Sequence, residues 1–261
     1  MERNFVFADA TTKFHSVPTP PMNLTTRFAN PAQFLKLSNW LMPIFGIASI
    51  MAFGIGLYLA LVDSPPDYQQ GETVSIMFIH VPAAWIGLML YVAMAIAAAT
   101  GIVAKHLLAD VFCVAAAPVG AVLVALCLVT GSIWGKPTWG AWWVWDARLT
   151  SVLVLFLLYC GYIVLRNAFD DPIRGAKAAG ILLLVGAVNI PIVKFSVDWW
   201  HTLHQPASVF RAGGSTIAPA LLHPLLMMAL AYACFAAFLV LLRMKTVLIT
   251  RRIEAAEMIG G

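Results

Sequence analysis

Two histidines lie at positions where an imidazole could serve as a metal ligand. His80 belongs to the segment IHVPAA (79–84) at the start of an apolar stretch, and His204 belongs to the segment WWHTLHQ (199–205). A neutral imidazole nitrogen is the commonest metal ligand in proteins. A single histidine at a membrane boundary is more often structural or solvated, so the interpretation depends on what accompanies the pair.

Tryptophans gather in one segment between these two histidines. Five of the nine tryptophans of the chain fall within residues 134–145. They are Trp134, Trp139, Trp142, Trp143 and Trp145. An aromatic belt at a membrane interface is the alternative interpretation, but a belt distributes tryptophans over many helix ends. A dense set of indoles, with Gly135 and Gly140 permitting tight turns, predicts a surface for a large, flat, apolar ligand.

The histidine pair and the indole surface together suit the chemistry of haem. Haem is a flat macrocycle whose iron can take two imidazoles from opposite faces, so we expect His80 and His204 to be axial ligands. The propionates of haem would meet a cation, for which Arg148, Lys136 and Arg211 are the candidates. A guanidinium in particular can bind a carboxylate through two parallel hydrogen bonds.

Three other polar residues lie near or within apolar stretches. Asp146 would be costly in lipid, so we expect it at the surface or paired with Arg148 or an indole N–H. Asn189 and Lys194, close to Pro191, could form a polar point for transport. An interhelical hydrogen bond from Asn189 and a snorkelling Lys194 are the simpler interpretation.

The remaining histidines and the cysteines carry weaker indications. His201 is an alternative ligand because it lies three residues before His204, whereas His223 precedes a proline and is expected to pack or to bond at a helix start. His106 and His15 are expected to be solvated. The four cysteines lie in apolar stretches without a CxxCH motif, so covalent haem attachment is not expected. They are Cys113, Cys127, Cys160 and Cys234.

Composition indicates that lipid is the solvent of these residues. The 261 residues are 61% hydrophobic and 11% charged, with a mean hydropathy of +0.87. Soluble domains carry about 25% charged residues. The net charge of +4 could indicate nucleic-acid binding, but cytoplasmic loops of membrane proteins collect Lys and Arg, so we expect a bilayer and no nucleic acid.

Six apolar stretches are each long enough to cross the bilayer as a helix, which takes about 17–25 residues. The sequence therefore predicts an all-α integral membrane protein with six transmembrane helices. The fifth span contains Pro191 near one end, where the backbone is expected to kink. The expected spans are about 40–62, 81–104, 112–133, 149–165, 178–197 and 217–242.

The distribution of Lys and Arg predicts the orientation. With the N-terminus inside, twelve of the sixteen cations fall in inside segments and three in outside loops, as the positive-inside rule requires. The expected domains are a cytoplasmic tail over 1–39, a six-helix domain over 40–245 and a cytoplasmic tail over 246–261. Three outside loops, including the Trp-rich loop over 134–148, then share one membrane face with both candidate ligands.

At these residues the sequence resembles the cytochrome c maturation protein C family, also called the haem exporter protein C family. This family belongs to the superfamily of haem-handling proteins with a Trp-rich "WWD" loop. The likeness runs from about residue 36 to residue 250. The segments that carry it are 67–71, 79–84, 131–150, 168–171, 179–181, 188–192 and 199–205.

The resemblance implies both site residues and partners. His80 and His204 match the two axial ligands of the family, and its haem-contact and chaperone-contact loop matches five residues here. They are Trp139, Trp142, Trp143, Trp145 and Asp146. The implied partners are a periplasmic haem chaperone, the membrane and ATPase subunits of an ABC-type transporter, and a small single-span subunit. The implied location is the bacterial inner (cytoplasmic) membrane, with the haem site on the periplasmic side.

The leading hypothesis is a haem-trafficking protein of cytochrome c biogenesis, not an enzyme. It would hold haem b without a covalent bond and deliver it to the chaperone. The chain lacks the GxxxxGK[ST] motif, so ATP chemistry would belong to a partner. A membrane electron-transfer subunit with a permanent bis-His haem is the alternative, although such haems usually lie deep in a bundle. A small-molecule permease would need a site near the bilayer midplane, for which only residues 189–194 give an indication.

Overall fold

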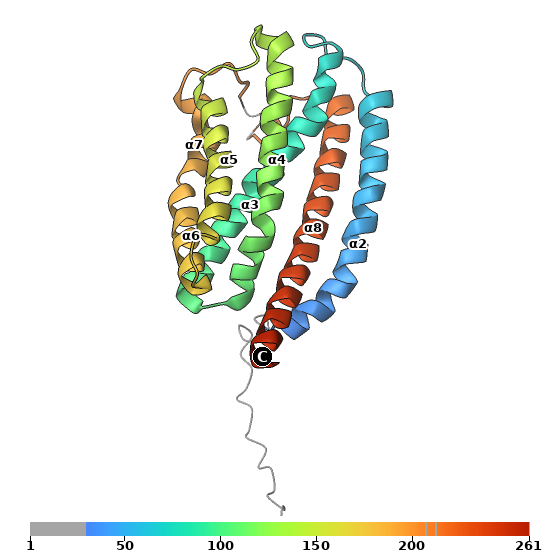
Figure 1. Cartoon of the computed structure of the whole chain (residues 1–261). Coiled ribbons are helices and arrows are strands. Elements are labelled where there is room, and N and C mark those ends of the chain that lie inside the picture. The colour runs from blue at the N-terminus through green and yellow to red at the C-terminus, as the bar shows by residue number, and fades with distance from the viewer. Residues whose placement is uncertain (1–29, 207, 212, 261) are drawn as a thin grey trace, which may run out of the picture.

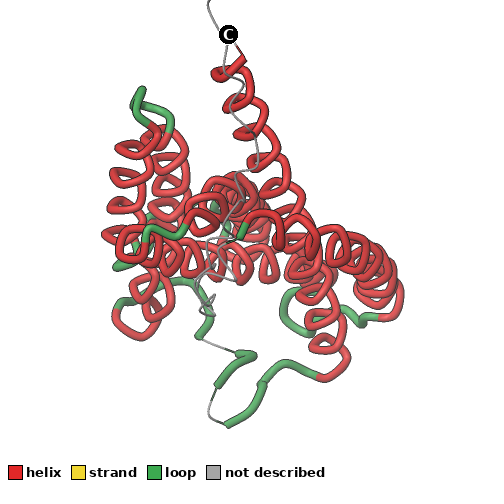
Figure 2. The backbone as a smooth tube through the Cα atoms, turned by 90° about the horizontal axis from the view of Figure 1, so that it is seen from below, coloured by secondary structure: helices red, strands yellow, loops and turns green. Residues whose placement is uncertain are grey.

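The computed structural model describes residues 30–260 of the chain, with the exception of residues 207 and 212. Within this part the regular structure is helical throughout, and six segments are long and apolar enough to cross a membrane (Figures 1 and 2). This confirms the all-α, six-span prediction. The elements are α2 (Pro31–Tyr58) continued by the π-helical turn η1 (Leu59–Asp63), the 3-10 turn η2 (Glu72–Ile76) leading into α3 (Met77–Ala104), α4 (Leu107–Trp139), α5 (Ala147–Arg166), α6 (Pro172–Gly186), α7 (Asn189–Trp199) and α8 (Pro219–Gly260).

Alternation of the spans brings three connections to one end of the bundle. Residues 64–71 and 140–146 and the described residues of 200–218 lie together at the top of Figure 1, and we call this the loop end. The start of α2 and the C-terminal part of α8 lie at the opposite end. The segments that carry His80, the tryptophans and His204 therefore share one end, as the alternating topology predicts.

Local sequence signals set several helix boundaries. The side chains of Asn30, Asp146 and Asp171 each accept a backbone N–H in the first turn of the helix that follows. Such caps satisfy donors that have no partner within the helix. At the other ends, Lys105 closes α3 and Gly140 closes α4 with left-handed φ angles of 50° and 79°. Glycine adopts this conformation without steric cost, which explains its use after Trp139.

Three boundaries differ from those that hydropathy predicts. Helix α4 continues through the tryptophans to Trp139, so the loop expected over 134–148 is reduced to residues 140–146. Lys136 and Pro137 interrupt the apolar pattern there, but the helix continues past the proline to Trp139, and Thr138 Oγ1 donates to Trp134 O at 2.7 Å within this last turn. The expected C-terminal tail is largely the end of α8, and α2 begins nine residues before the expected span. The rest of the expected N-terminal tail, with His15, lies outside the described residues.

The fifth span is broken into two helices. Helix α6 ends at Gly186 and α7 begins at Asn189, with a turn at Ala187 and Val188 between them. Pro191 lies four residues after Ala187, and a proline cannot donate to the carbonyl four residues before it. The expected kink is therefore present, and it lies one turn before the proline.

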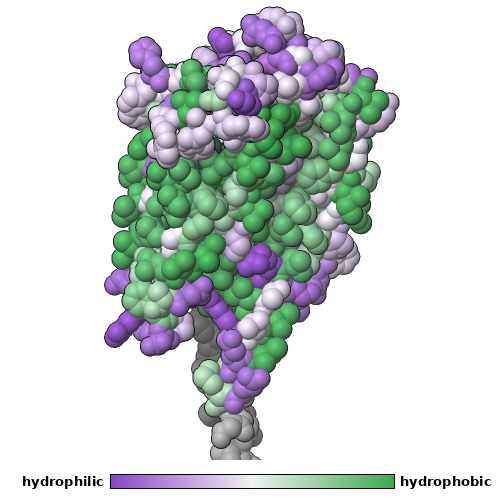
Figure 3. Space-filling model, turned by 45° about the horizontal axis from the view of Figure 1, so that its top comes forward, coloured by the Kyte–Doolittle hydropathy of each residue, from purple (hydrophilic) through white to green (hydrophobic). Residues whose placement is uncertain are grey.

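The outer surface and the core of the bundle divide as in a membrane protein. On the face shown in Figure 3 a broad apolar band covers the helices, and hydrophilic residues gather toward both ends. In the core α3 packs along α4, and α2 packs along α8. The buried Tyr159 of α5 donates a hydrogen bond of 2.7 Å to Gly87 O of α3, so these two helices meet around one satisfied polar group.

An ion-pair cluster fastens the end opposite the loops. Asp110 of α4 contacts Arg166 of α5 at 3.2 Å and Arg251 of α8 at 2.7 Å. All three side chains are partly buried, which reduces screening by salt. The three helices that lead toward the tryptophans and His204 are thus joined at their far ends.

Candidate functional site

His80 lies in the first turn of α3 and faces one turn of α4. Its Nδ1 lies 2.9 Å from Cys127 O and 3.2 Å from Thr130 Oγ1. Its Nε2 lies 3.9 Å from Cys127 Sγ. A backbone carbonyl can only accept a hydrogen bond, so the imidazole donates from Nδ1.

A glycine and a tryptophan of α4 complete the surroundings of His80. A Cβ at Gly131 would lie 2.8 Å from His80 Cε1, so the ring approaches the α4 backbone more closely than any other residue there would allow. The Trp134 ring packs edge-on against the imidazole, with centroids 5.7 Å apart. Trp134 Nε1 in turn donates to Gln70 Oε1 at 2.9 Å, which ties the first loop to this cluster.

His204 is held by the loop that carries the tryptophans. Its Nδ1 lies 3.4 Å from Asp146 Oδ2, and its ring packs against Trp139 with centroids 4.8 Å apart. The Asp146 side chain is buried and also accepts from Leu203 N at 3.2 Å and from Leu149 N at 2.8 Å. The expectation of a surface Asp146, or one paired with Arg148 or an indole N–H, is wrong. Asp146 joins the start of α5 to the last loop, because backbone N–H groups satisfy the buried carboxylate.

The surroundings of His204 favour its neutral form. Burial lowers the pKa of His204 below its usual value of 6.5, the negative charge of Asp146 offsets part of this change, and the positive charge of Arg148 lowers it further. The neutral imidazole is the form that can bind a metal. His80 and His204 also lie close enough for a charge on one to act on the other, although they belong to segments 124 residues apart in the chain.

The two best cation candidates already have partners. Arg148 Nε donates to Ser196 Oγ of α7 at 2.7 Å, and its Nη2 lies 3.5 Å from Lys194 O. Lys136 Nζ donates to Gly140 O at 3.1 Å, where it caps the end of α4. Arg211 lies exposed in the last loop. Contact of these cations with a propionate stays a prediction.

Residues 142–145 form the outer edge of the loop. Trp142 and Trp145 are 57% and 75% exposed, whereas Trp143 is half-buried and packs against Trp145 with ring centroids 5.5 Å apart. Ser132 Oγ donates to Trp142 O at 2.7 Å and holds the edge against α4. The buried Trp143 Nε1 has no acceptor among the described residues. A buried donor without a partner costs about 1–3 kcal/mol, so it is available to an incoming acceptor.

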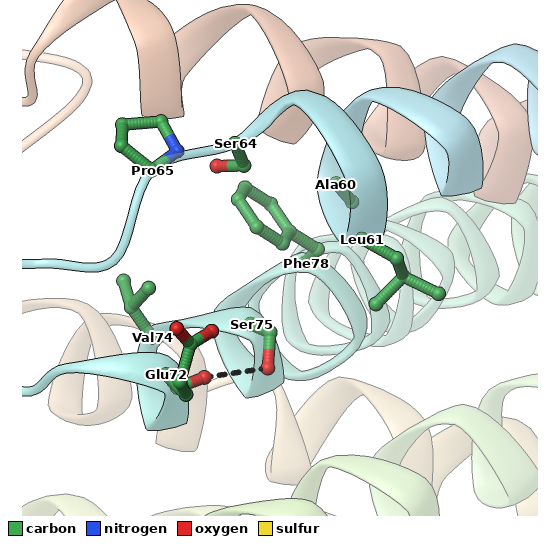
Figure 4. A pocket seen from close by; sticks show the side chains of 8 residues that line it. All are labelled: Ala60, Leu61, Ser64, Pro65, Glu72, Val74, Ser75 and Phe78. Atoms are coloured by element: carbon green, nitrogen blue, oxygen red, sulfur yellow. Dashed lines mark hydrogen bonds between the residues drawn. The ribbon is translucent and has the colours of Figure 1, made fainter.

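Two cavities open at the loop end. One of about 280 Å³ lies between the three outer segments and is lined by Gln69, Gln70, Thr73, Pro137, Thr138 and Gln205. The other, of about 120 Å³, lies between η1 and the start of α3, where Phe78, Ser64 and Glu72 face it (Figure 4). Both are smaller than the roughly 300–1,000 Å³ of typical small-molecule sites, and neither is lined by His80 or His204.

The residues given weaker roles also have clear positions. His201 and His223 are exposed, and His106 is half-buried with Nδ1 shielded, not solvated as expected. Asn189 donates to Ser151 O at 2.9 Å, the interhelical bond that the simpler interpretation predicts. Lys194 is exposed on α7, in keeping with a snorkelling side chain.

The comparisons with known proteins agree on one family. The family model described as heme exporter protein C matches residues 24–259. The chain belongs to this family. The heme exporter protein C of Bradyrhizobium diazoefficiens is 51% identical over 230 residues, which cover 88% of this chain and 87% of the relative. That of Escherichia coli K12 is 43% identical over 223 residues, which cover 85% of this chain and 90% of the relative.

A relative from a plant shares the same likeness. A ccmC-like mitochondrial protein of cytochrome c biosynthesis from Marchantia polymorpha is 44% identical over 199 residues, 76% of this chain and 82% of the relative. Membership of the heme exporter protein C family makes the chain a membrane transport component and not an enzyme. It assigns the chain to the haem handling of cytochrome c biogenesis.

Four site residues were missed by the sequence analysis. They are Thr130, Gln70 and Ser196, which form hydrogen bonds with His80, Trp134 and Arg148, and Gly131, against which the His80 ring lies. Each contact joins segments far apart in the chain. Thr130 and Gly131 do interrupt an apolar run one turn before Trp134, which is the one local signal that could have indicated them.

Proposed function

We propose that this protein binds haem b between His80 and His204 at its loop end and delivers it to a periplasmic haem chaperone. Haem is the cargo and is held without a covalent bond, because the chain has no CxxCH motif. Axial coordination by two imidazoles holds the macrocycle and can be reversed by ligand exchange. A carrier needs this combination, since its cargo must leave again.

One observation carries the proposal. The Trp-rich segment contacts both candidate ligands, with Trp134 packed on His80 and Trp139 packed on His204. Indoles of one segment thus pack against both imidazoles, which suits a flat ligand with apolar faces and a metal at its centre.

The protonation of both imidazoles supports the same proposal. Each histidine directs Nδ1 toward an acceptor, Cys127 O for His80 and Asp146 Oδ2 for His204. This leaves Nε2 of each ring with its lone pair, the arrangement usual for metal-bound histidine. The lowered pKa of His204 keeps that ring neutral at pH 7.

The exposed edge of the loop supports delivery. Trp142 and Trp145 present large apolar surfaces at the end of the bundle, where a protein partner could cover them. The unpartnered Trp143 Nε1 can donate to an acceptor on the cargo or on that partner. Arg148 and Lys136 would serve the propionates only after exchanging their present acceptors.

The proposal includes a location and further partners. Under the positive-inside rule, the Lys and Arg at the opposite end support a cytoplasmic location for that end in a bacterium and a periplasmic location for the loop end. The energy for release would come from an ABC-type transporter with its membrane and ATPase subunits, assisted by a small single-span subunit. Binding of such a partner can shift the populations of loaded and released states.

A visible spectrum of the purified protein tests the proposal. Wild type loaded with haem should show a six-coordinate, low-spin bis-imidazole spectrum. His80→Ala and His204→Ala should each lose that spectrum and bind haem at least ten times more weakly, and the double variant should bind it only non-specifically. His201→Ala, next to the second ligand, is the matched control and should resemble wild type. A double variant with the wild-type spectrum would falsify the assignment of the ligands.

A further inference from the structure

The imidazole of His80 is surrounded by groups that determine which of its nitrogens carries the proton. Cys127 O lies 2.9 Å from Nδ1 and can only accept. Thr130 Oγ1 also lies near Nδ1, at 3.2 Å, and its own hydrogen is directed to Leu126 O at 2.7 Å. The hydroxyl therefore has only lone pairs to offer the ring. Both neighbours of Nδ1 are acceptors, so Nδ1 bears the hydrogen.

The other nitrogen of the ring has a neighbour of the opposite kind. Cys127 Sγ lies 3.9 Å from Nε2, and a thiol is a weak donor. This contact is compatible with an unprotonated Nε2 and is weak enough to be displaced by a metal. The two contacts of Nδ1 thus favour a single tautomer, and the contact of Nε2 is compatible with it.

Gly131 determines how the ring lies on the helix. An added Cβ would come within 2.8 Å of Cε1 and 3.3 Å of Nδ1, and no real Cβ tolerates the shorter distance. A side chain here would push the ring away from Cys127 O, and both bonds to Nδ1 would lengthen. The absence of a side chain at 131 is therefore a condition for the tautomer.

We infer that residues 127–131 of α4 form a cradle that fixes His80 with Nε2 free for iron, and that Thr130 and Gly131 are positioning residues of the haem site. The role of the cradle in haem binding rests on the proposed function, but the tautomer of His80 can be measured without haem. Groups that bond the far nitrogen of a metal-binding histidine typically change metal affinity by about 10–100-fold.

The first experiment uses haem-free full-length protein in detergent, labelled with ¹⁵N-histidine. Two-bond nitrogen–proton correlation spectra separate protonated from unprotonated ring nitrogens, and the His80→Ala spectrum assigns the signal. We expect a protonated Nδ1 and an unprotonated Nε2 for His80. A protonated Nε2 overturns the inference, whether or not the protein binds haem.

The second experiment compares two pairs of variants after loading with haem. Thr130→Val removes the acceptor but keeps the shape, whereas Thr130→Ser retains the hydroxyl. Gly131→Ala adds the obstructing methyl, whereas Gly54→Ala adds one where nothing lies within 4 Å. We expect about 10–100-fold weaker haem binding for Gly131→Ala. We expect a smaller loss for Thr130→Val and wild-type affinity for Thr130→Ser and Gly54→Ala.

The spectra distinguish positioning from a general structural effect. Gly131→Ala should lose the low-spin signal of bound imidazole while the helical circular dichroism is retained, and added free imidazole should restore it. Wild-type affinity and spectrum in both Gly131→Ala and Thr130→Val overturn the positioning role, provided that His80→Ala has lost haem. If His80→Ala itself keeps haem, the proposed function fails, while the measured tautomer still decides the inference.

Discussion

The two candidate ligands are held by different kinds of structure. His80 lies on a helix and bonds to the backbone of a neighbouring helix, against Gly131. His204 lies in a loop and depends on one carboxylate and one indole, both at the ends of elements. Packed helices resist local opening, whereas loops open at low cost. If the protein carries haem as proposed, we expect His80 to keep the orientation of the cargo and His204 to be the ligand that exchanges.

Removal of the Asp146 carboxylate should separate the two ligands most clearly. Asp146→Ala removes the hydrogen bond to His204, so haem affinity should fall about 10–100-fold in a haem titration. The variant also loses the cap of α5, which costs about 1 kcal/mol of stability. Asp171→Ala is the matched control, because Asp171 caps α6 in the same way but away from both histidines. Equal haem affinity in the two variants would contradict a role for Asp146 in the site.

The dependence of haem binding on pH should follow His204. Burial lowers the pKa of this ring below 6.5, so the neutral, iron-binding form persists to mildly acidic pH. Below the pKa, affinity should fall by up to tenfold per pH unit as the imidazole is protonated. The charge of Asp146 raises this pKa, so Asp146→Asn should move the fall to lower pH, while Asp171→Asn should leave it in place. A fall that moves to higher pH in Asp146→Asn would contradict the electrostatic argument.

The helix-held ligand offers a finer test at Gln70. Gln70→Ala removes the acceptor of Trp134 Nε1, and a hydrogen bond of this kind contributes about 1 kcal/mol. If the packed indole passes half or more of this free energy on to the position of His80, haem affinity falls about 2–5-fold. Gln69→Ala changes the neighbouring residue of the same cavity and should bind haem as wild type does. Identical titrations for the two variants would remove Gln70 from the cluster.

The smallest effect on haem affinity is expected at the exposed edge. Trp145→Ala should change stability by no more than about 0.5 kcal/mol and haem affinity less than about 2-fold, because the side chain is 75% exposed. Transfer to the purified chaperone should nevertheless slow several-fold, as followed by stopped-flow absorbance. Trp40→Ala removes a tryptophan with the same exposed fraction on α2 and serves as the control. Equal transfer rates would argue against the edge as a contact for the partner.

Much of the fold could be predicted from sequence because hydropathy reports the local solvent of each residue. The six spans and the kink near Pro191 follow from such local information. The extension of α4 to Trp139 could not be predicted in this way, since Lys136 and Pro137 end the apolar run. The helix nevertheless continues to Trp139, and the left-handed Gly140 ends it by donating its N–H to Lys136 O.

The site was predicted in its residue types but not in its contacts. His80, His204 and the tryptophans stand out by chemistry and spacing. The acceptor for His80 is the backbone carbonyl of Cys127, and the residue type at a position does not indicate which carbonyl will accept a bond. The position of Asp146 before Ala147 is an N-cap pattern that could have indicated its role at the start of α5. Its bond to His204 spans 58 residues and depends on the fold.

The ion-pair cluster at Asp110 gives the bundle a fixed base. Because α4, α5 and α8 are pinned together there, tilting of one against another must pivot near this point. Displacement grows with distance from the pivot, so a small angular change at this base moves the opposite helix ends the most. The opposite helix ends lie around the tryptophans, so we expect such tilting to displace the candidate site more than the base.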